Sequence, residues 1–344
     1  MNKFLTLLKR DIADNKGALI ITPLVIAAFI LSIAVLGMMF GKFNYGDGGF
    51  NFDARNTGEA HAQMNVDGKQ FQMHKDKNGV LVMDDGHGNV HPVFSMMDPK
   101  EKQEATQIFV IASAFGASIP LWVAAISILF VLSSSLFDER KEKSIMFWKS
   151  LPVSDLQTVV AKMVSIAGGG IGFAMIVSMV LHFALIGVTF LGLSIYGVNM
   201  MDSGAVFNAY FAFWGIAWVG ILVWFLWTLP AHGWFLLSSA YAPKAPFLAA
   251  ILPIVLLPVL GKIFFRGDSD LFMIPLQHLM GEPVFSAITD TARTTNDPST
   301  ISDLAATTIP AILNTLTQPQ LWIGLAAAAG LIYAASEVRR RHAL

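Results

Sequence analysis

A charged run, DERKEK at residues 138–143, offers the most chemistry in this 344-residue chain, and long apolar stretches flank it. Glu139 and Lys143 stand four residues apart, a spacing at which opposite charges pair along a helix. An aromatic pair and a Leu-Pro stop follow, and Ser154 is a candidate cap for the next helix. The pattern predicts a short amphipathic helix and a tight turn that contacts a soluble partner. The candidate contact residues are Asp138, Glu139, Arg140, Lys143, Phe147, Trp148, Leu151, Pro152 and Ser154. A charged loop with aromatic interface anchors is the alternative.

One histidine, His182, lies inside a long apolar stretch, where an ionisable side chain marks a functional candidate. The aromatic residues Phe211, Trp214 and Trp218 lie on a later apolar stretch and could line a pathway for an amphipathic substrate. The alternatives, which we favour, are a histidine hydrogen-bonded to a neighbouring helix and aromatic side chains at the membrane interface.

Other kinds of chemistry are absent from the sequence. It contains no GxxxxGK[ST], HExxH or GxSxG motif, so we expect no catalytic site and no ATP bound by this chain. Cysteine is absent, and the histidines of residues 41–105 match no zinc pattern, so no metal site is predicted and they are interpreted as exposed loop residues. These histidines are His61, His74, His87 and His91. A net charge of −1 gives no bias towards nucleic acid.

The composition indicates a helical membrane protein. Hydrophobic residues make up 54% of the chain and charged residues 14%, and the mean hydropathy is +0.58. Soluble domains carry about 25% charged residues. A spanning helix needs about 20 apolar residues. Six segments of that kind are predicted, at 18–40, 108–136, 159–191, 206–229, 245–265 and 321–335.

Lysine and arginine are distributed unevenly between the connecting segments. If the N-terminus is cytoplasmic, the cytoplasmic segments carry 13 of the 23 basic residues, at more than twice the density of the opposite side. The positive-inside rule therefore predicts that both termini are cytoplasmic. Residues 1–17 are then a cytoplasmic interfacial helix with Phe4, Leu5, Leu8 and Ile12 on one face, residues 137–158 a cytoplasmic segment, and residues 336–344 a cytoplasmic tail. Residues 41–105 and 266–320 are extracytoplasmic.

The insert at 41–105 shows strand and turn patterns. Asn78-Gly79 lies between apolar-alternating runs at 70–74 and 80–83, which is a strong hairpin signal. The fold class predicted is thus an all-α polytopic membrane protein of six transmembrane helices, both termini cytoplasmic, with a small β-containing extracytoplasmic insert between helices one and two. Glycines 168–170 predict that the third span is tilted or broken, and Gly168 and Gly172 permit close helix contact.

The cytoplasmic segment resembles the loop after the second span in ABC-2 type permeases, the transmembrane subunits of bacterial ATP-binding-cassette exporters. The residues that carry this likeness are Glu139-Arg140, the stretch 145–148, Leu151-Pro152-Val153-Ser154 and Lys162. The segment 234–246, WFLLSSAYAPKAP, is similar to the loop between spans four and five of such permeases. This chain has Lys143-Ser144-Ile145 where the broader family often has Gly-Thr, so the subfamily and the substrate stay open.

The resemblance implies a multi-pass permease of the cytoplasmic (inner) membrane. Two six-helix permeases, identical or different, would form the pathway, and separate ATPase subunits carrying ATP and Mg would dock on residues 137–154. The alternative is a membrane sensor or assembly factor whose insert binds a ligand or partner without an ATPase. A secondary carrier ranks last, because charged residues are almost absent from the spans.

Overall fold

Six helices among the described residues of this computed structural model are long and apolar enough to cross a membrane. They are Gly17–Met39, Lys102–Lys141, Asp155–Ser194, Ser203–Tyr241, Pro246–Phe264 and Pro319–Arg341. The structure describes residues 3–39, 42–45, 50–53, 62–66, 69–75, 81–84, 90–92, 99–143, 153–195, 202–264, 270–294 and 301–341. The prediction of six long apolar helices is confirmed, and the chain is a multi-pass membrane protein.

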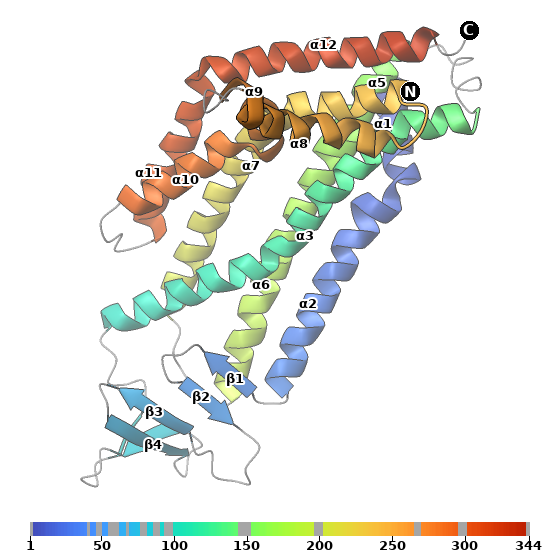
Figure 1. Ribbon diagram of the computed structural model, residues 1–344. Coiled ribbons are helices and arrows are strands. Elements are labelled where there is room, and N and C mark those ends of the chain that lie inside the picture. The colour runs from blue at the N-terminus through green and yellow to red at the C-terminus, as the bar shows by residue number, and fades with distance from the viewer. Residues whose placement is uncertain are drawn as a thin grey trace.

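Four long helices, α2, α3, α6 and α7, run side by side along the molecule (Figure 1). Their bounds are Thr22–Met39, Pro99–Lys141, Gly170–Ile195 and Ser203–Tyr241. With a rise of about 1.5 Å per residue, α3 is about 65 Å long and extends well beyond a hydrocarbon layer of about 30 Å. Fully buried side chains of Ile128, Leu132, Ile166 and Phe235 fill the space between these helices.

The last helix, α12 (Pro319–Arg341), packs along α7. A Cβ atom at Gly233 of α7 would lie 3.3 Å from the Cβ of Leu331 and 3.4 Å from the carbonyl oxygen of Ala328. Glycine therefore allows the two helices to approach closely at this point. Helix α8 (Pro246–Phe264) lies on the same side of α7, so α7 is covered by both.

Three short helices connect α8 with α12. They are α9 (Asp270–Met280), α10 (Glu282–Thr294) and α11 (Ile301–Asn314), and a 3-10 turn at Thr315–Thr317 follows α11. Helix α9 has 11 residues, too few to span a bilayer, and packs against α7 and α8. The indole nitrogen of Trp224 donates a hydrogen bond to the Met280 carbonyl at 2.9 Å, which fixes the end of α9 on α7.

The third span is continuous rather than broken at its glycines. Helix α5 (Asp155–Lys162) passes through a π-helical segment, Met163–Gly169, into α6. The close approach occurs at Gly170, where a Cβ would lie 2.9 Å from Leu19 Cδ2 and 3.1 Å from Ile128 Cδ1. Gly172 has no such neighbour within 4 Å. Gly170, and neither Gly168 nor Gly172, is therefore the glycine that the packing with α2 and α3 requires.

The chain begins with α1 (Lys3–Asp14), an amphipathic helix as predicted, joined to α2 through a π-helical turn at Gly17–Ile21. Leu7 and Asp11 form the face that is buried in the protein. Leu5, on the predicted apolar face, is exposed. Because the exposed apolar side chain points away from the bundle, it is available to lipid.

Six short strands form one antiparallel sheet in which each strand pairs with the next in sequence. They are β1 (Lys42–Tyr45), β2 (Phe50–Asp53), β3 (Ala62–Val66), β4 (Lys69–Lys75), β5 (Leu81–Asp84) and β6 (Val90–Pro92). β4 pairs with β5 in the register Lys75↔Leu81. The predicted turn residues Asn78 and Gly79 lie outside the described residues. The sheet follows the end of α2 that is remote from both chain termini (Figure 1).

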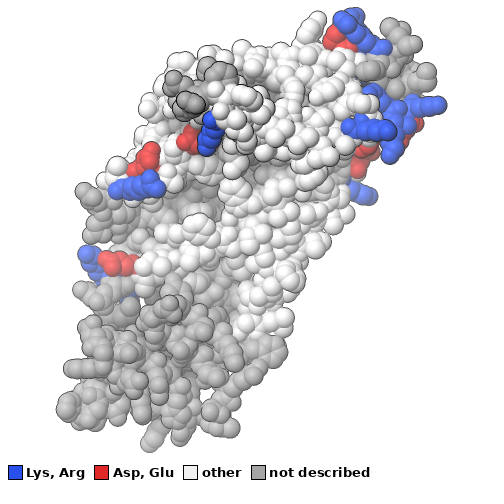
Figure 2. Space-filling view, viewed as in Figure 1, with Lys and Arg blue, Asp and Glu red and all other residues white. Residues whose placement is uncertain are grey.

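Among the described residues, charged side chains gather most densely at one end of the molecule, and smaller groups lie along its left side (Figure 2). Figure 2 shows a cluster of Lys and Arg with some Asp and Glu at the upper right, where α1, the end of α3 and the end of α12 meet, and a broad uncharged surface beside it. Such a surface suits lipid, and the basic end is the one at which both termini lie.

Candidate functional site

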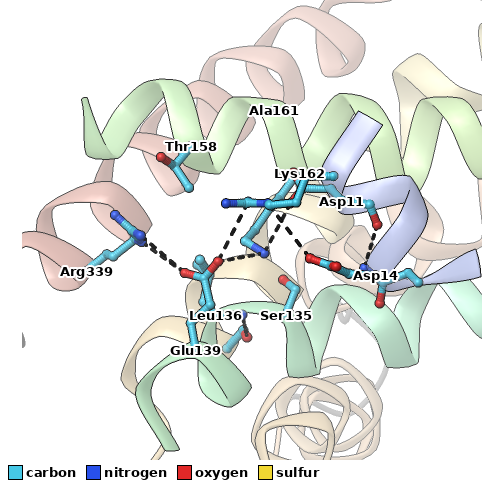
Figure 3. Close-up of polar contacts among 12 residues, drawn as sticks. Asp11, Asp14, Ser135, Leu136, Glu139, Thr158, Ala161, Lys162 and Arg339 are labelled. Carbon is cyan, nitrogen blue, oxygen red and sulfur yellow. Dashed lines mark hydrogen bonds and ion pairs between the residues drawn. The ribbon is translucent and has the colours of Figure 1, made fainter. Parts of the chain in front are cut away.

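The side chain of Glu139 is the centre of a buried ion-pair network at the end of α3 (Figure 3). The residue is 8% exposed. Its Oε1 lies 3.0 Å from Lys162 Nζ and 3.9 Å from Arg10 Nη2, and its Oε2 lies 3.2 Å from Arg339 Nη2. One carboxylate of α3 therefore holds cations from α1, α5 and α12.

Two further carboxylates complete the network. Asp11 of α1 pairs with its neighbour Arg10, and its Oδ1 lies 3.8 Å from Lys162 Nζ. Asp155, at the start of α5, pairs with Arg339 of α12. The exposed Asp14 also lies 3.9 Å from Arg10 Nε (Figure 3). Within the protein, three cations thus face three carboxylates, and the formal charges of these six groups cancel. Buried ions are tolerated only when pairing offsets their lost hydration, so this alternation of charge is what allows the four helices to meet here.

Arg140 has a different role, because its guanidinium binds the end of α7. Its Nη2 donates hydrogen bonds to the carbonyl oxygens of Ser239 at 3.0 Å and Ala242 at 2.8 Å. The Ser239 hydroxyl accepts from the backbone N–H groups of Leu136 and Phe137. The last carbonyls of a helix lack partners within it, so this arginine caps α7 and joins it to α3.

Ser154 forms the cap that the sequence predicts. Its hydroxyl accepts from the Gln157 backbone N–H at 3.1 Å, and the Gln157 side chain accepts from the Ser154 backbone N–H at 3.2 Å. This reciprocal capping box fixes where α5 begins. It thereby positions both Asp155 and Lys162 for the network.

The predicted contact residues therefore fall into three groups. Asp138, Lys143 and Ser154 are exposed. Glu139 is buried and Arg140 half-buried, and the contacts above connect both to other helices of this chain. The remaining predicted contact residues lie outside the described residues; they are Phe147, Trp148, Leu151 and Pro152.

A polar groove of about 440 Å³ adjoins the network. It lies between the start of α5 and the end of α12 and is lined by Ser154, Asp155, Leu156, Tyr333, Glu337 and Arg340 among others. Leu156 and Tyr333 are exposed apolar and aromatic side chains beside charges of both signs. A surface of this composition is suited to a protein contact.

His182 is fully buried between α3, α6 and α7, and its ring is completely hydrogen-bonded. Trp214 Nε1 donates to Nδ1 at 2.9 Å, so Nε2 carries the proton in the neutral ring. Nε2 lies 3.0 Å from the Val110 carbonyl oxygen and 3.1 Å from the Ser113 hydroxyl. Trp214 is buried with it, Trp218 is half-buried, and Phe211 is 62% exposed on the outer surface. The structure joins His182 to Trp214, and Phe211 points elsewhere.

The metal prediction can be compared with only part of the chain. In the ranges described by the structure, no group of three or more His, Asp or Glu side chains is placed to hold a metal ion. His61 and His87 lie outside the described residues, and the side chains of His74 in β4 and His91 in β6 are not described.

Sequence reasoning missed Asp11 and the role of Arg339. Asp11 follows Leu7 by four residues on the buried face of α1, which is the signal that could have identified it. Arg339 belongs to the predicted cytoplasmic tail 336–344, yet it is 3% exposed and reaches two carboxylates.

None of the family models, curated proteins or solved structures compared with this chain matches it.

Proposed function

We propose that this chain is the transmembrane permease subunit of an ATP-binding-cassette exporter of the ABC-2 type. It would pair with a second permease in the cytoplasmic (inner) membrane, with both termini in the cytoplasm. Separate ATPase subunits, which carry the ATP and Mg, would bind at the cytoplasmic face. The support from the sequence is the resemblance of residues 137–154 and 234–246 to the cytoplasmic loops of such permeases.

One structural observation carries the proposal. At the basic end of the molecule, α1, α3, α5 and α12 are joined by a buried network, and Arg140 joins α3 to α7. A displacement of the exposed surface around α5 would therefore be transmitted to α1, α3, α7 and α12 as well as to α5. A coupling surface needs this property, because the movement of an ATPase must be transmitted to the membrane helices rather than absorbed by a loop.

The surface available to the ATPase differs from the set of residues in the sequence prediction. Asp138, Lys143 and Ser154 are exposed and can contact a partner, and the groove beside Ser154 and Tyr333 extends that surface. Glu139 and Arg140 would act through the helices that they hold in place.

The experiment is purification of the full chain in mild detergent from its own cells, followed by identification of the proteins that accompany it. We expect a stoichiometric P-loop ATPase. The double charge reversal Asp138→Lys with Lys143→Glu should release it. The double charge reversal Lys100→Glu with Glu104→Lys is the matched control, because this exposed pair lies near the start of the same helix, α3, far from the proposed contact.

A preparation that retains other complexes but contains no ATPase would contradict the proposal. It would favour the second candidate, a sensor or assembly factor. The observation behind that candidate is the six-stranded sheet between α2 and α3, which is larger than a simple connection requires. Replacing residues 41–98 by a flexible linker would then abolish function, whereas the charge reversal would not.

A further inference from the structure

A cavity of about 400 Å³ opens between α7, α8, α9 and α12. Its volume falls in the range of small-molecule sites. The lining is apolar apart from His278 and Gln320. Pro230, Pro253 and Pro275 each contribute to the wall. A proline ring cannot continue the helical hydrogen-bond ladder and pushes against the preceding turn, so three of the four elements are prevented from packing tightly at this level.

The cavity lies within the apolar part of the molecule. Its wall comes from the interior of α7 at Ala231, of α8 at Ile254 and of α12 at Gly324, and α9 closes it from the fourth side. In the part of the chain that the structure describes, no Asp, Glu, Lys or Arg lines it. A charged ligand would lose its hydration without an opposite charge to compensate, so the lining favours a neutral one.

The buried polar group at the cavity is the ring of His278, which is 7% exposed, whereas Gln320 is exposed. Its Nδ1 lies 2.8 Å from the Trp227 carbonyl oxygen. A carbonyl only accepts, so Nδ1 carries the proton and Nε2 of the neutral ring is an acceptor. Nε2 receives no hydrogen bond from the part of the chain that the structure describes. Nε2 is not one of the fully enclosed side-chain atoms without a partner, so part of its surface stays open beside the cavity. An acceptor in an apolar surrounding without a hydrogen bond is costly.

Gly324 of α12 lies directly against the ring of His278. A Cβ at that position would lie 2.5 Å from Cε1 and 3.1 Å from Nε2 of His278. Any other residue would therefore displace the ring. Glycine lets α12 pass close to the histidine, and both residues line the cavity.

The mouth of the cavity faces the side of the helix bundle. Ile323 is 70% exposed, and Leu257, Ile274 and Ala327 are exposed beside it. These side chains form part of the uncharged surface that suits lipid. A ligand that enters here arrives from the hydrocarbon layer, not from water.

We propose that this cavity binds a neutral, mainly hydrocarbon molecule whose hydroxyl group donates a hydrogen bond to Nε2 of His278. The apolar lining takes the chain of such a lipid-like alcohol, and the unpartnered acceptor fixes its polar end. The site goes beyond the proposed transport function and does not depend on an ATPase partner.

The test uses the purified full chain in lipid nanodiscs and two photoreactive probes, a dodecanol with a diazirine in the chain and its methyl ether. The ether has the same shape along the chain but cannot donate a hydrogen bond. We expect the alcohol to label α9 and α12 several-fold more than the ether, and unlabelled dodecanol to compete. Equal labelling by the two probes, without competition, would overturn the proposal and indicate ordinary contact with lipid.

Variants locate the site independently. His278→Asn keeps a donor in the place of Nδ1 and removes the Nε2 acceptor, so it should abolish the preference for the alcohol. Ala327→Phe should block the mouth and reduce labelling, whereas Ala326→Phe, an exposed neighbour that does not line the cavity, should not. A folded Ala327→Phe protein that is labelled as strongly as wild type contradicts the assignment. The alcohol-to-ether ratio of the wild type decides the matter even if a variant fails to fold.

Discussion

The ion-pair network around Glu139 and the cavity at His278 differ in how their polar side chains are paired. In the network, three carboxylates and three cations from four helices compensate one another. At the cavity, one histidine nitrogen is bonded to Trp227, and the other has no hydrogen-bond partner among the described residues. Ion pairs shared between helices hold those helices together, whereas an acceptor without a partner beside a cavity leaves capacity for a ligand. The two regions therefore predict different consequences of mutation, large for stability at the first and large for binding at the second.

The largest effect is expected for Glu139→Gln. The change keeps the shape of the side chain but leaves Lys162 and Arg339 buried without the carboxylate that they share. Removing one partner of a buried ion pair costs about 3–5 kcal/mol. We expect a much lower yield of folded protein and a lower thermal unfolding midpoint in detergent.

Glu142→Gln is the matched control, since Glu142 is exposed just past the end of the same helix. Its effect should stay within about 0.5 kcal/mol. Equal midpoints for the two variants would mean that the network does not stabilise the fold, and the contrast with the cavity would be lost.

His182→Phe should produce the next largest effect. It removes the acceptor for Trp214 Nε1 in a fully buried place. A buried donor left without a partner costs about 1–3 kcal/mol. Thermal unfolding measures this loss, and labelling by the alcohol probe should be unchanged because His182 does not line the cavity.

Phe211→Leu tests the two roles that the sequence suggests for the aromatic residues of α7, a substrate pathway or side chains at the membrane interface. Phe211 is exposed on the outer surface, so its replacement should leave stability nearly unchanged. If His182→Phe or Phe211→Leu abolished function while the unfolding midpoint stayed at the wild-type value, the replaced residue would belong to a substrate pathway rather than to the packed core.

Gly324→Ala and Gly330→Ala compare a glycine at the cavity with a glycine elsewhere on α12. The added Cβ would lie 2.5 Å from His278 Cε1, so the ring must move, at a cost of about 1–3 kcal/mol. Gly330→Ala on α12 has nothing within 4 Å of its Cβ and should be neutral or stabilising by up to about 1 kcal/mol. Unfolding midpoints that move in opposite directions would support the close approach at Gly324.

Hydropathy and local motifs predicted the features that depend on neighbouring residues. The six apolar helices follow from runs of apolar residues, and the cap at Ser154 follows from a serine just after the Leu-Pro stop. The reciprocal bond from Gln157 was not predicted. The π-helical segment that ends at Gly169 was anticipated only as a tilt or break, because spacing along the chain does not distinguish a widened turn from a kink.

Contacts between distant segments could not be predicted in the same way. Glu139 looks exposed in sequence, because the run around it is charged, and its burial depends on Arg339, 200 residues away. His278 lies in an ordinary amphipathic pattern, and neither the missing partner of Nε2 nor the facing glycine of α12 is visible locally. Side-chain bonding across helices is a property of the packed fold and leaves no spacing signal in one sequence.

Ser154→Ala tests how strongly the capped end of α5 supports the network. Loss of the capping hydroxyl should cost about 1 kcal/mol. Ser154→Asp should retain most of the stability, since aspartate is an equally good cap. The unfolding midpoints of the two variants provide the measurement. If both lower the midpoint equally, capping does not explain the role of Ser154, and its position in the groove beside Tyr333 becomes the explanation.

A small effect on stability is expected for His278→Asn, and this variant separates the two regions most clearly. The asparagine amide can replace Nδ1 as donor to the Trp227 carbonyl, while the lost Nε2 has no partner among the described residues. The unfolding midpoint without ligand should therefore remain within about 1 kcal/mol of the wild type. Dodecanol should raise the midpoint of the wild type but not that of the variant, because a ligand stabilises only a protein that binds it. If the midpoint fell as far as that of His182→Phe, His278 would have a structural role like that of His182. The proposed difference between a fully hydrogen-bonded histidine and a ligand-binding histidine would then be wrong.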